Sequence, residues 1–118
     1  MRKVLKIIND ELNAMNIPYT FDGWDKELEL PQFIGEISET TTLNEDGLSE
    51  YTIILTGYAI KNEVGYLFDV AERLKERYKP SKIVDGMVIM YNNAMPIETN
   101  TDDLKRIEIT LKIKKWSV

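Results

Sequence analysis

Carboxylates are the side chains of this sequence whose grouping could support metal chemistry. Glu98, Asp102 and Asp103 lie close together in the chain, and paired carboxylates can hold Mg²⁺. A second acidic stretch, "NEDGLSE", places acids around Gly47 but lacks the ligand spacing of a calcium loop. Solvated turns explain both stretches more simply, so we expect no metal ion and no other cofactor.

Two absent residue types argue against acid–base and nucleophilic catalysis. The chain has no cysteine and no histidine, which removes thiolates and the commonest general base. A serine nucleophile would then need a lysine base, yet Ser81 and Lys82 are adjacent in a predicted turn. We predict that the protein is not an enzyme. A metal-dependent enzyme using Glu98, Asp102 and Asp103 is a lesser alternative.

Length and charge restrict the remaining possibilities. The 118 residues fit one domain, 1–118, and the net charge of −5 argues against a sequence-specific or general nucleic-acid binder. Lys112, Lys114 and Lys115 are more simply interpreted as blunting the edge of a sheet. The opening "MRKVLKIINDELNAM" contains no uninterrupted apolar segment, so we expect neither a signal peptide nor a membrane span. The expected location is the cytoplasm.

Two amphipathic helices are predicted. Apolar residues at helical spacing, Val4 to Met15, indicate a helix of about 14 residues that ends before Pro18. A second stripe runs from Val64 to Tyr78 and ends before Pro80, with Asn62 as the expected N-cap. Its charged side is interpreted as a solvated face. The second stripe comprises Val64, Leu67, Phe68, Ala71, Leu74 and Tyr78.

Strand signals fill most of the rest. Residues 19–21 read as a short strand and 27–30 as a possible second, Ile83–Tyr91 as a largely apolar strand, and Arg106–Trp116 as an alternating, half-buried one. Asn92–Leu104 is predicted to be a long loop, either functional or disordered. The expected fold class is α+β, a single domain whose antiparallel sheet packs against two helices in the order α-β-β-β-β-α-β-β.

A long β-hairpin dominates the middle of the chain. The stretch "GEISETTTLNEDGLSEYTIILTGYAI", 35–60, predicts two arms around Glu45-Asp46-Gly47, the first mostly polar. A three-residue loop with left-handed Gly47 would set Ile37 opposite Leu55, and it separates polar from apolar residues better than a two-residue turn does. Ten-residue arms span about 33 Å, so the hairpin either crosses the whole body or projects from it.

Aromatic residues gather in the first third of the chain: Tyr19, Phe21, Trp24 and Phe33. Core filling is the favoured interpretation, and a binding surface is the alternative.

Three stretches carry a family resemblance. They are "NIPYTFDGW" (16–24), "FIGEISETTTLNEDGLSEYTIILTGYAI" (33–60) and "KRIEITLKIKKW" (105–116). Together they resemble small phage and prophage structural proteins from Gram-positive hosts, of the tail-terminator or head–tail joining type. This resemblance implies a sheet flanked by helices, assembly into a homo-oligomeric ring, possibly a hexamer, contact with tail-tube or connector proteins, and a final location in the virion.

The functional hypothesis is therefore a non-enzymatic virion subunit of a ring at the tail or the head–tail junction. In such a ring the polar hairpin arm could meet a neighbour. The candidate interface residues lie on the hairpin and on the predicted long loop: Thr40, Thr42, Glu45, Asp46, Glu50, Thr52, Met95, Ile97 and Asn100. The alternative is a small cytoplasmic binding module that recognises a peptide or a small ligand.

Overall fold

The computed structural model describes residues 2–21, 31–41, 48–79, 81–99 and 103–116, with the side chains of residues 40, 41, 48, 61 and 116 left aside. The helical elements are α1 (Arg2–Ala14), the 3-10 turn η1 (Lys61–Glu63) and α2 (Val64–Tyr78). The strands are β1 (Tyr19–Phe21), β2 (Gln32–Thr41), β3 (Leu48–Ile60), β4 (Lys82–Val84), β5 (Met87–Ile97) and β6 (Leu104–Trp116).

The described strands form one six-stranded sheet in the order β1-β2-β3-β6-β5-β4. β1 pairs with β2 in parallel, and every other described pair is antiparallel. The α+β class is confirmed, with a mixed sheet in place of the expected antiparallel one. The possible strand at 27–30 lies outside the described residues.

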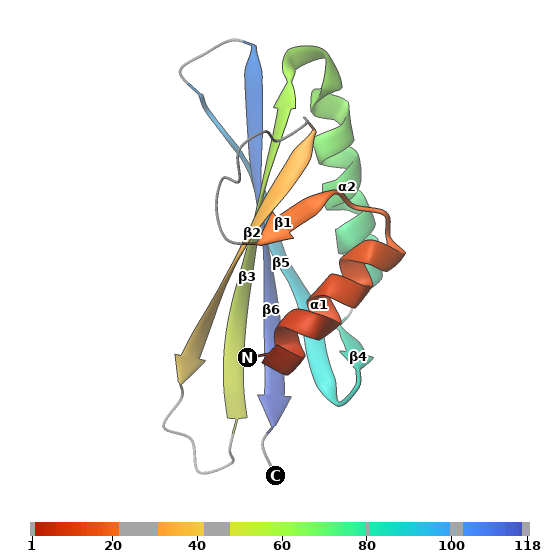
Figure 1. Ribbon diagram of the computed structural model, residues 1–118, viewed down its shortest axis with the longest axis vertical. Helices are drawn as coiled ribbons and strands as arrows, with labels where there is room; N and C mark the ends of the chain where they lie inside the picture. Colours follow the sequence, from red (N-terminus) through yellow and green to blue (C-terminus); the bar gives the residue numbers. More distant parts are fainter. Residues whose placement is uncertain (1, 22–30, 42–47, 80, 100–102, 117–118) are drawn as a thin grey trace.

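Both helices lie on the same side of the sheet (Figure 1). Alternate residues of each strand point toward them, and we call this side the helix face. Ile53, Leu55, Ile109 and Ile113 are fully buried there, in one cluster with Val4 of α1 and other helix residues. The predicted alternation of β6 is thereby confirmed, because its odd-numbered residues Ile107 to Ile113 are the buried ones. The favoured interpretation of the aromatic group also holds where it is described: Phe33 is buried, and Tyr19 and Phe21 pack against the core. Trp24 is outside the described residues.

The β2–β3 hairpin crosses the whole molecule. β3 has 13 residues, which at about 3.3 Å per residue is close to the 49 Å long axis. Its register differs from the predicted one, because Ile37 faces Ile53 rather than Leu55 and Thr41 faces Ser49 rather than Tyr51. The shift is an even number, so each residue keeps its predicted face; Gly47 itself lies outside the described residues.

The predicted strand Ile83–Tyr91 is two strands joined by a tight turn. Asp85 and Gly86 both have positive φ, 51° and 81°, and Val84 faces Met87 across them. Two such residues define a type I′ hairpin turn. The Asp-Gly pair between apolar residues was the sequence signal for it.

The predicted loop Asn92–Leu104 is also largely strand, because β5 continues to Ile97. The pairing with β6 shifts by one residue at Asn92, which forms a bulge between Tyr91 and Asn93. Pro96 is accommodated because β4 pairs only with residues 87–89, so Pro96 lies in a part of β5 that has no second neighbouring strand among the described residues.

The second helix begins later than predicted. Asn62 lies in η1, and Glu63 occupies the N-cap position without a side-chain cap hydrogen bond. Most of the predicted apolar stripe is buried, including Leu67, Leu74 and Tyr78, but Phe68 is 45% exposed. The expected end before Pro80 is confirmed.

The interpretation that the lysines of β6 blunt an edge of the sheet is wrong. β6 lies in the interior of the sheet, between β3 and β5. Lys112 donates a hydrogen bond to Thr52 Oγ1 at 3.0 Å, and Lys114 lies 3.9 Å from Glu50. These cations pair across the sheet with residues of β3.

Candidate functional site

The side of the sheet opposite the helices, which we call the open face, is covered by neither helix (Figure 1). Along each strand, the residues of the open face alternate with the buried residues of the helix face. The central side chains of the open face are half-buried. The two middle strands carry two acidic and three basic residues on this face. These central residues are Glu50, Thr52, Ile54, Thr56 and Tyr58 of β3 and Arg106, Glu108, Thr110, Lys112 and Lys114 of β6.

The structure brings most of the described candidate interface residues onto this open face. Glu50 and Thr52 lie at one end of it, where Glu50 faces position 40 of β2. Met95, 51% exposed, and half-buried Ile97 lie toward the other end, on β5. Met95 is level with Thr56 through Glu108, so the two groups are separated by roughly 20 Å along the strands. Thr42, Glu45, Asp46 and Asn100 lie outside the described residues.

Charged residues of α2 that were interpreted as solvated instead bind α1. Glu11 of α1 accepts hydrogen bonds from Arg77 Nε at 3.1 Å, Arg77 Nη2 at 3.0 Å and the Tyr78 hydroxyl at 2.7 Å. Lys82 Nζ of β4 lies 3.5 Å from the same carboxylate, whose side chain is 13% exposed. Arg73 donates to the backbone carbonyl of Met15, just beyond α1. This cluster fixes α1 against α2 and β4.

Electrostatics in the Glu11 cluster favour the charged carboxylate. Burial raises the pKa of Glu11. The hydrogen bonds from Arg77 and Tyr78 and the charges of Arg77 and Lys82 together lower the pKa by more than burial raises it, so it lies below its usual value. Burial, together with the neighbouring carboxylate, raises the pKa of Tyr78. The cluster is thus a structural ion pair that ties three elements together.

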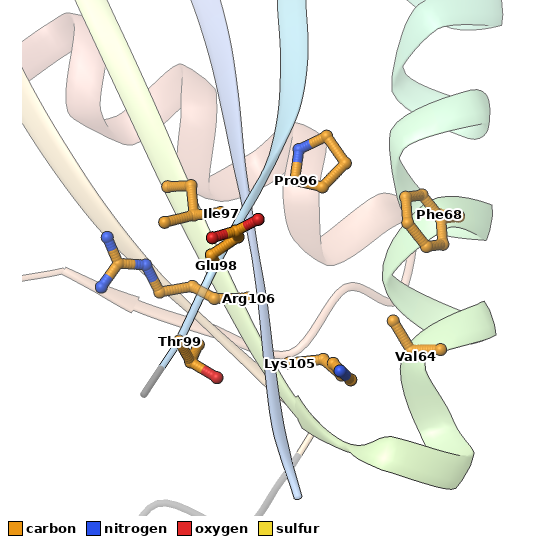
Figure 2. A pocket seen from close by; sticks show the side chains of 8 residues that line it. All are labelled: Val64, Phe68, Pro96, Ile97, Glu98, Thr99, Lys105 and Arg106. Carbon is orange, nitrogen blue, oxygen red and sulfur yellow. The ribbon is translucent and has the colours of Figure 1, made fainter. Parts of the chain in front are cut away.

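A half-open pocket of about 550 Å³ lies beside the start of α2. Figure 2 shows Val64 and Phe68 on α2 and Pro96 on the strand opposite, while Arg106 extends away from the helix. The Arg106 Nε atom is buried without a hydrogen-bond partner. The lining residues are Val64, Phe68, Pro96, Ile97, Glu98, Thr99, Lys105 and Arg106. Apolar residues line this pocket together with Lys105, Arg106 and the carboxylate of Glu98, which suits an amphipathic ligand with polar groups.

Exposed apolar side chains were the features that sequence reasoning missed. Ile83 is 73% exposed, Phe68 45% and Ile60 41%. Ile83 was predicted to begin a largely apolar strand, and the Asp85-Gly86 pair was the signal that a turn follows it instead. Phe68 follows the helical period of the buried stripe, but it lines the pocket beside α2.

Metal ligation has no support in the described part of the chain. There, no group of three or more aspartate, glutamate, histidine or cysteine side chains is arranged to hold an ion. Glu98 and Asp103 are exposed, and Asp102 is outside the described residues. Within the same residues, no helix is long and apolar enough to cross a membrane.

Comparison with known proteins adds no relative to this picture. The sequence matches no protein-family model and no curated protein.

Proposed function

We propose that this chain is a non-enzymatic structural subunit of a phage or prophage virion, which assembles into a homo-oligomeric ring at the tail or the head–tail junction. The observation that carries the proposal is a long sheet, in a molecule whose longest axis is 49 Å, which the helices cover on one face only. An isolated monomer gains little from a long sheet whose second face and edges stay unpaired, whereas a subunit can use them for contacts.

The mixed chemistry of the open face also supports a role in contacts. Glu50 and Glu108 lie among Arg106, Lys112 and Lys114, and charges of both signs on one surface can give specificity and orientation to an interface. The sequence resemblance contributes the location, and tail-tube or connector proteins are the expected further partners.

The test is the mass of the purified protein by light scattering across a wide concentration range, with electron microscopy of any large species. We expect a closed ring, with six subunits as the expected number. A monomer at every concentration, both alone and mixed with tail-tube or connector protein, would contradict the proposal.

The second candidate function is a cytoplasmic binding module, and the pocket beside α2 favours it. Its volume of about 550 Å³ falls within the range of small-ligand sites. The test is NMR titration of the protein with short acidic peptides that carry an aromatic side chain. Shifts confined to the pocket, and abolished by Phe68→Ser, would favour this function over a ring.

A further inference from the structure

Each edge of the sheet has a step, formed by a short strand beside a longer one. At one edge β1 pairs only with residues 33–35 of β2, so the outer side of 36–41 has no partner strand among the described residues. At the other edge β4 pairs only with residues 87–89 of β5, so the outer side of 90–97 is similarly unpaired. Each edge therefore combines one projecting strand with one recessed segment.

The two steps are complementary because of where the register places them. Thr20 of β1 pairs with Ile34, and Ile34 is level with Met95 through Thr56 and Glu108. The projecting β1 is thus level with the recessed part of β5. The same relation holds at the other end of the sheet. There Ile83 of β4 is level with Thr40 of β2, through Val88, Lys114 and Glu50 on the strands between them. The projecting β4 is thus level with the recessed part of β2.

We infer that a second copy of this chain occupies these steps, head to tail: β4 of one subunit lies beside residues 39–41 of the next, and β1 of the next lies beside residues 94–96 of the first. This inference rests on the proposed function and specifies its interface. A rotation about an axis along the strands keeps strand directions and the helix face, and it brings the opposite edges together at one height. Repetition of such a contact closes a ring without a rise between subunits.

Strand directions are compatible with this contact. Within one subunit β2 and β5 run in opposite directions, because β3 and β6 intervene in an antiparallel series. β4 therefore runs parallel to β2, and β1 antiparallel to β5. The backbone of β2 from 36 to 41 contains neither proline nor lysine, the residues that usually protect an edge from pairing. Pro96 and the bulge at Asn92 limit backbone pairing on β5, so side chains must provide most of that half of the contact.

The side chains at the two steps match in chemistry. Ile83 and Met95, 73% and 51% exposed, are the two most exposed large apolar residues of the described chain, and one lies at each end of the same edge. Lys82, with its side chain 38% exposed, is level with exposed Glu39 on the helix face. At the other step Tyr19 is level with Pro96. A head-to-tail contact therefore covers apolar surface and brings Glu39 level with Lys82, whose ammonium also lies 3.5 Å from Glu11.

Two other arrangements of a second copy are less favourable. A two-fold pairing of β2 with β2 centred on Glu39 would place that carboxylate opposite its own copy, which is repulsive. Any two-fold pairing of β2 leaves β4 and Ile83 uncovered. Stacking of two open faces would also leave both steps empty. Each alternative predicts a different cross-link.

Cysteine cross-linking tests the inference cleanly, because the natural chain contains no cysteine. The double variant Thr40→Cys/Ile83→Cys joins β4 to β2, which we call the lower step. The double variant Thr20→Cys/Met95→Cys joins β1 to β5, which we call the upper step. Four strand spacings separate the members of each pair within one subunit, about 19 Å, whereas a disulfide needs Cα atoms within about 7 Å. Any disulfide between them is therefore formed between subunits. The control Thr20→Cys/Ile83→Cys combines two projecting strands.

Circular dichroism and thermal melting first show that each variant folds. The two double variants test the two steps independently of each other. We expect both pairs, after mild oxidation, to give a ladder that ends at the mass of the wild-type ring, and the control to give none. A wild-type ring with no cross-link in either pair overturns the inference and leaves the proposed function standing. If the single variant Thr40→Cys forms as much cross-linked dimer as the double variant Thr40→Cys/Ile83→Cys, the chains pair by a two-fold axis, and the head-to-tail inference is overturned as well. A wild-type chain that stays monomeric overturns it together with the ring.

Discussion

At the scale of single residues, two glycines of the sheet make room for aromatic rings. Gly57 of β3 faces Phe33 of β2, and a Cβ atom at residue 57 would lie 2.5 Å from Phe33 Cε1. Gly35 has the same relation to Phe21. Phe33 is fully buried, so its ring could move only by displacing the side chains packed around it. The glycines are therefore required by packing across strands rather than by backbone conformation.

Replacing Gly57 by alanine should consequently lower the free energy of unfolding by about 2 kcal/mol, the usual cost of overpacking. Gly65→Ala is the matched control, because a Cβ atom there meets nothing within 4 Å. In the helical position of Gly65, alanine should leave stability unchanged or raise it by up to about 1 kcal/mol. Urea unfolding of both variants measures the difference. Equal stability of Gly57→Ala and the wild type would refute the tight contact with Phe33.

The Glu11 cluster provides a prediction for pH. The pKa of Glu11 is lower in the folded chain than its ordinary value, so the unfolded chain binds the proton more tightly. The stabilisation is therefore present above the unfolded pKa, about 4.3, and it is lost as the pH falls through the folded pKa. At pH 7 the variant Glu11→Gln should lose about 1–3 kcal/mol, because it removes the partner of Arg77, Tyr78 and Lys82.

Urea unfolding at pH 7, 5, 4 and 3 measures this effect. We expect the difference between the wild type and Glu11→Gln to shrink as the pH falls below 5. Glu76→Gln is the control, because Glu76 is exposed on α2 and its change should move stability by less than about 0.5 kcal/mol. A pH-independent difference would show that shape, rather than charge, stabilises the cluster.

At the scale of elements, the β4–β5 turn determines where Ile83 lies. Gly86 has φ of 81°, which a β-branched residue adopts only with strain. Gly86→Val should lower the free energy of unfolding by about 1–2 kcal/mol. Asp85→Asn should have little effect, because asparagine also accepts the left-handed conformation and the ion pair of Asp85 with Lys3 is exposed, at 3.9 Å. Melting of the two variants is the measurement, and equal melting temperatures would contradict the type I′ turn.

Elements whose signal is local were the ones that the sequence predicted well. The two helices depend on apolar periodicity and a following proline, and β6 depends on strict alternation, so each is present with nearly the expected ends. The hairpin register was wrong by an even shift, because the faces of a strand are encoded by alternation but the residue that each position pairs with is not. Asn92–Ile97 was taken for a loop because it contains two asparagines and a proline, although β6 pairs with this segment through backbone atoms.

The candidate site was predictable only in part, for a related reason. Alternation places Glu50 and Thr52 on the face away from the helices, and the structure agrees. The central position of β6 and the steps at the edges depend instead on which strands become neighbours. That order is set by long-range pairing of β3 with β6, for which a single sequence gives no signal. The binding of Arg73 and Arg77 to α1 was missed on the same ground.

At the scale of the whole molecule, amide hydrogen exchange should separate the interior of the sheet from its edges. β3 and β6 have strands on both sides, so their amides should exchange slowest in any state. The edge segments should exchange much faster in a monomer, since they have a partner on one side at most. These segments are residues 19–21, 36–41, 82–84 and 93–97.

Assembly through the steps would change this pattern in a specific way. Backbone pairing at the lower step should slow exchange on the order of tenfold or more at outward amides of 36–41 and 82–84. Changes at 19–21 and 93–97 should be smaller, because Pro96 and the bulge at Asn92 weaken pairing there. Contact through the open face would protect none of these amides, since it buries side chains of strands whose backbone is already paired. Exchange measured at dilute and assembled concentrations therefore discriminates edge pairing from face stacking, and unchanged exchange at 36–41 in a ring would exclude the β2–β4 contact.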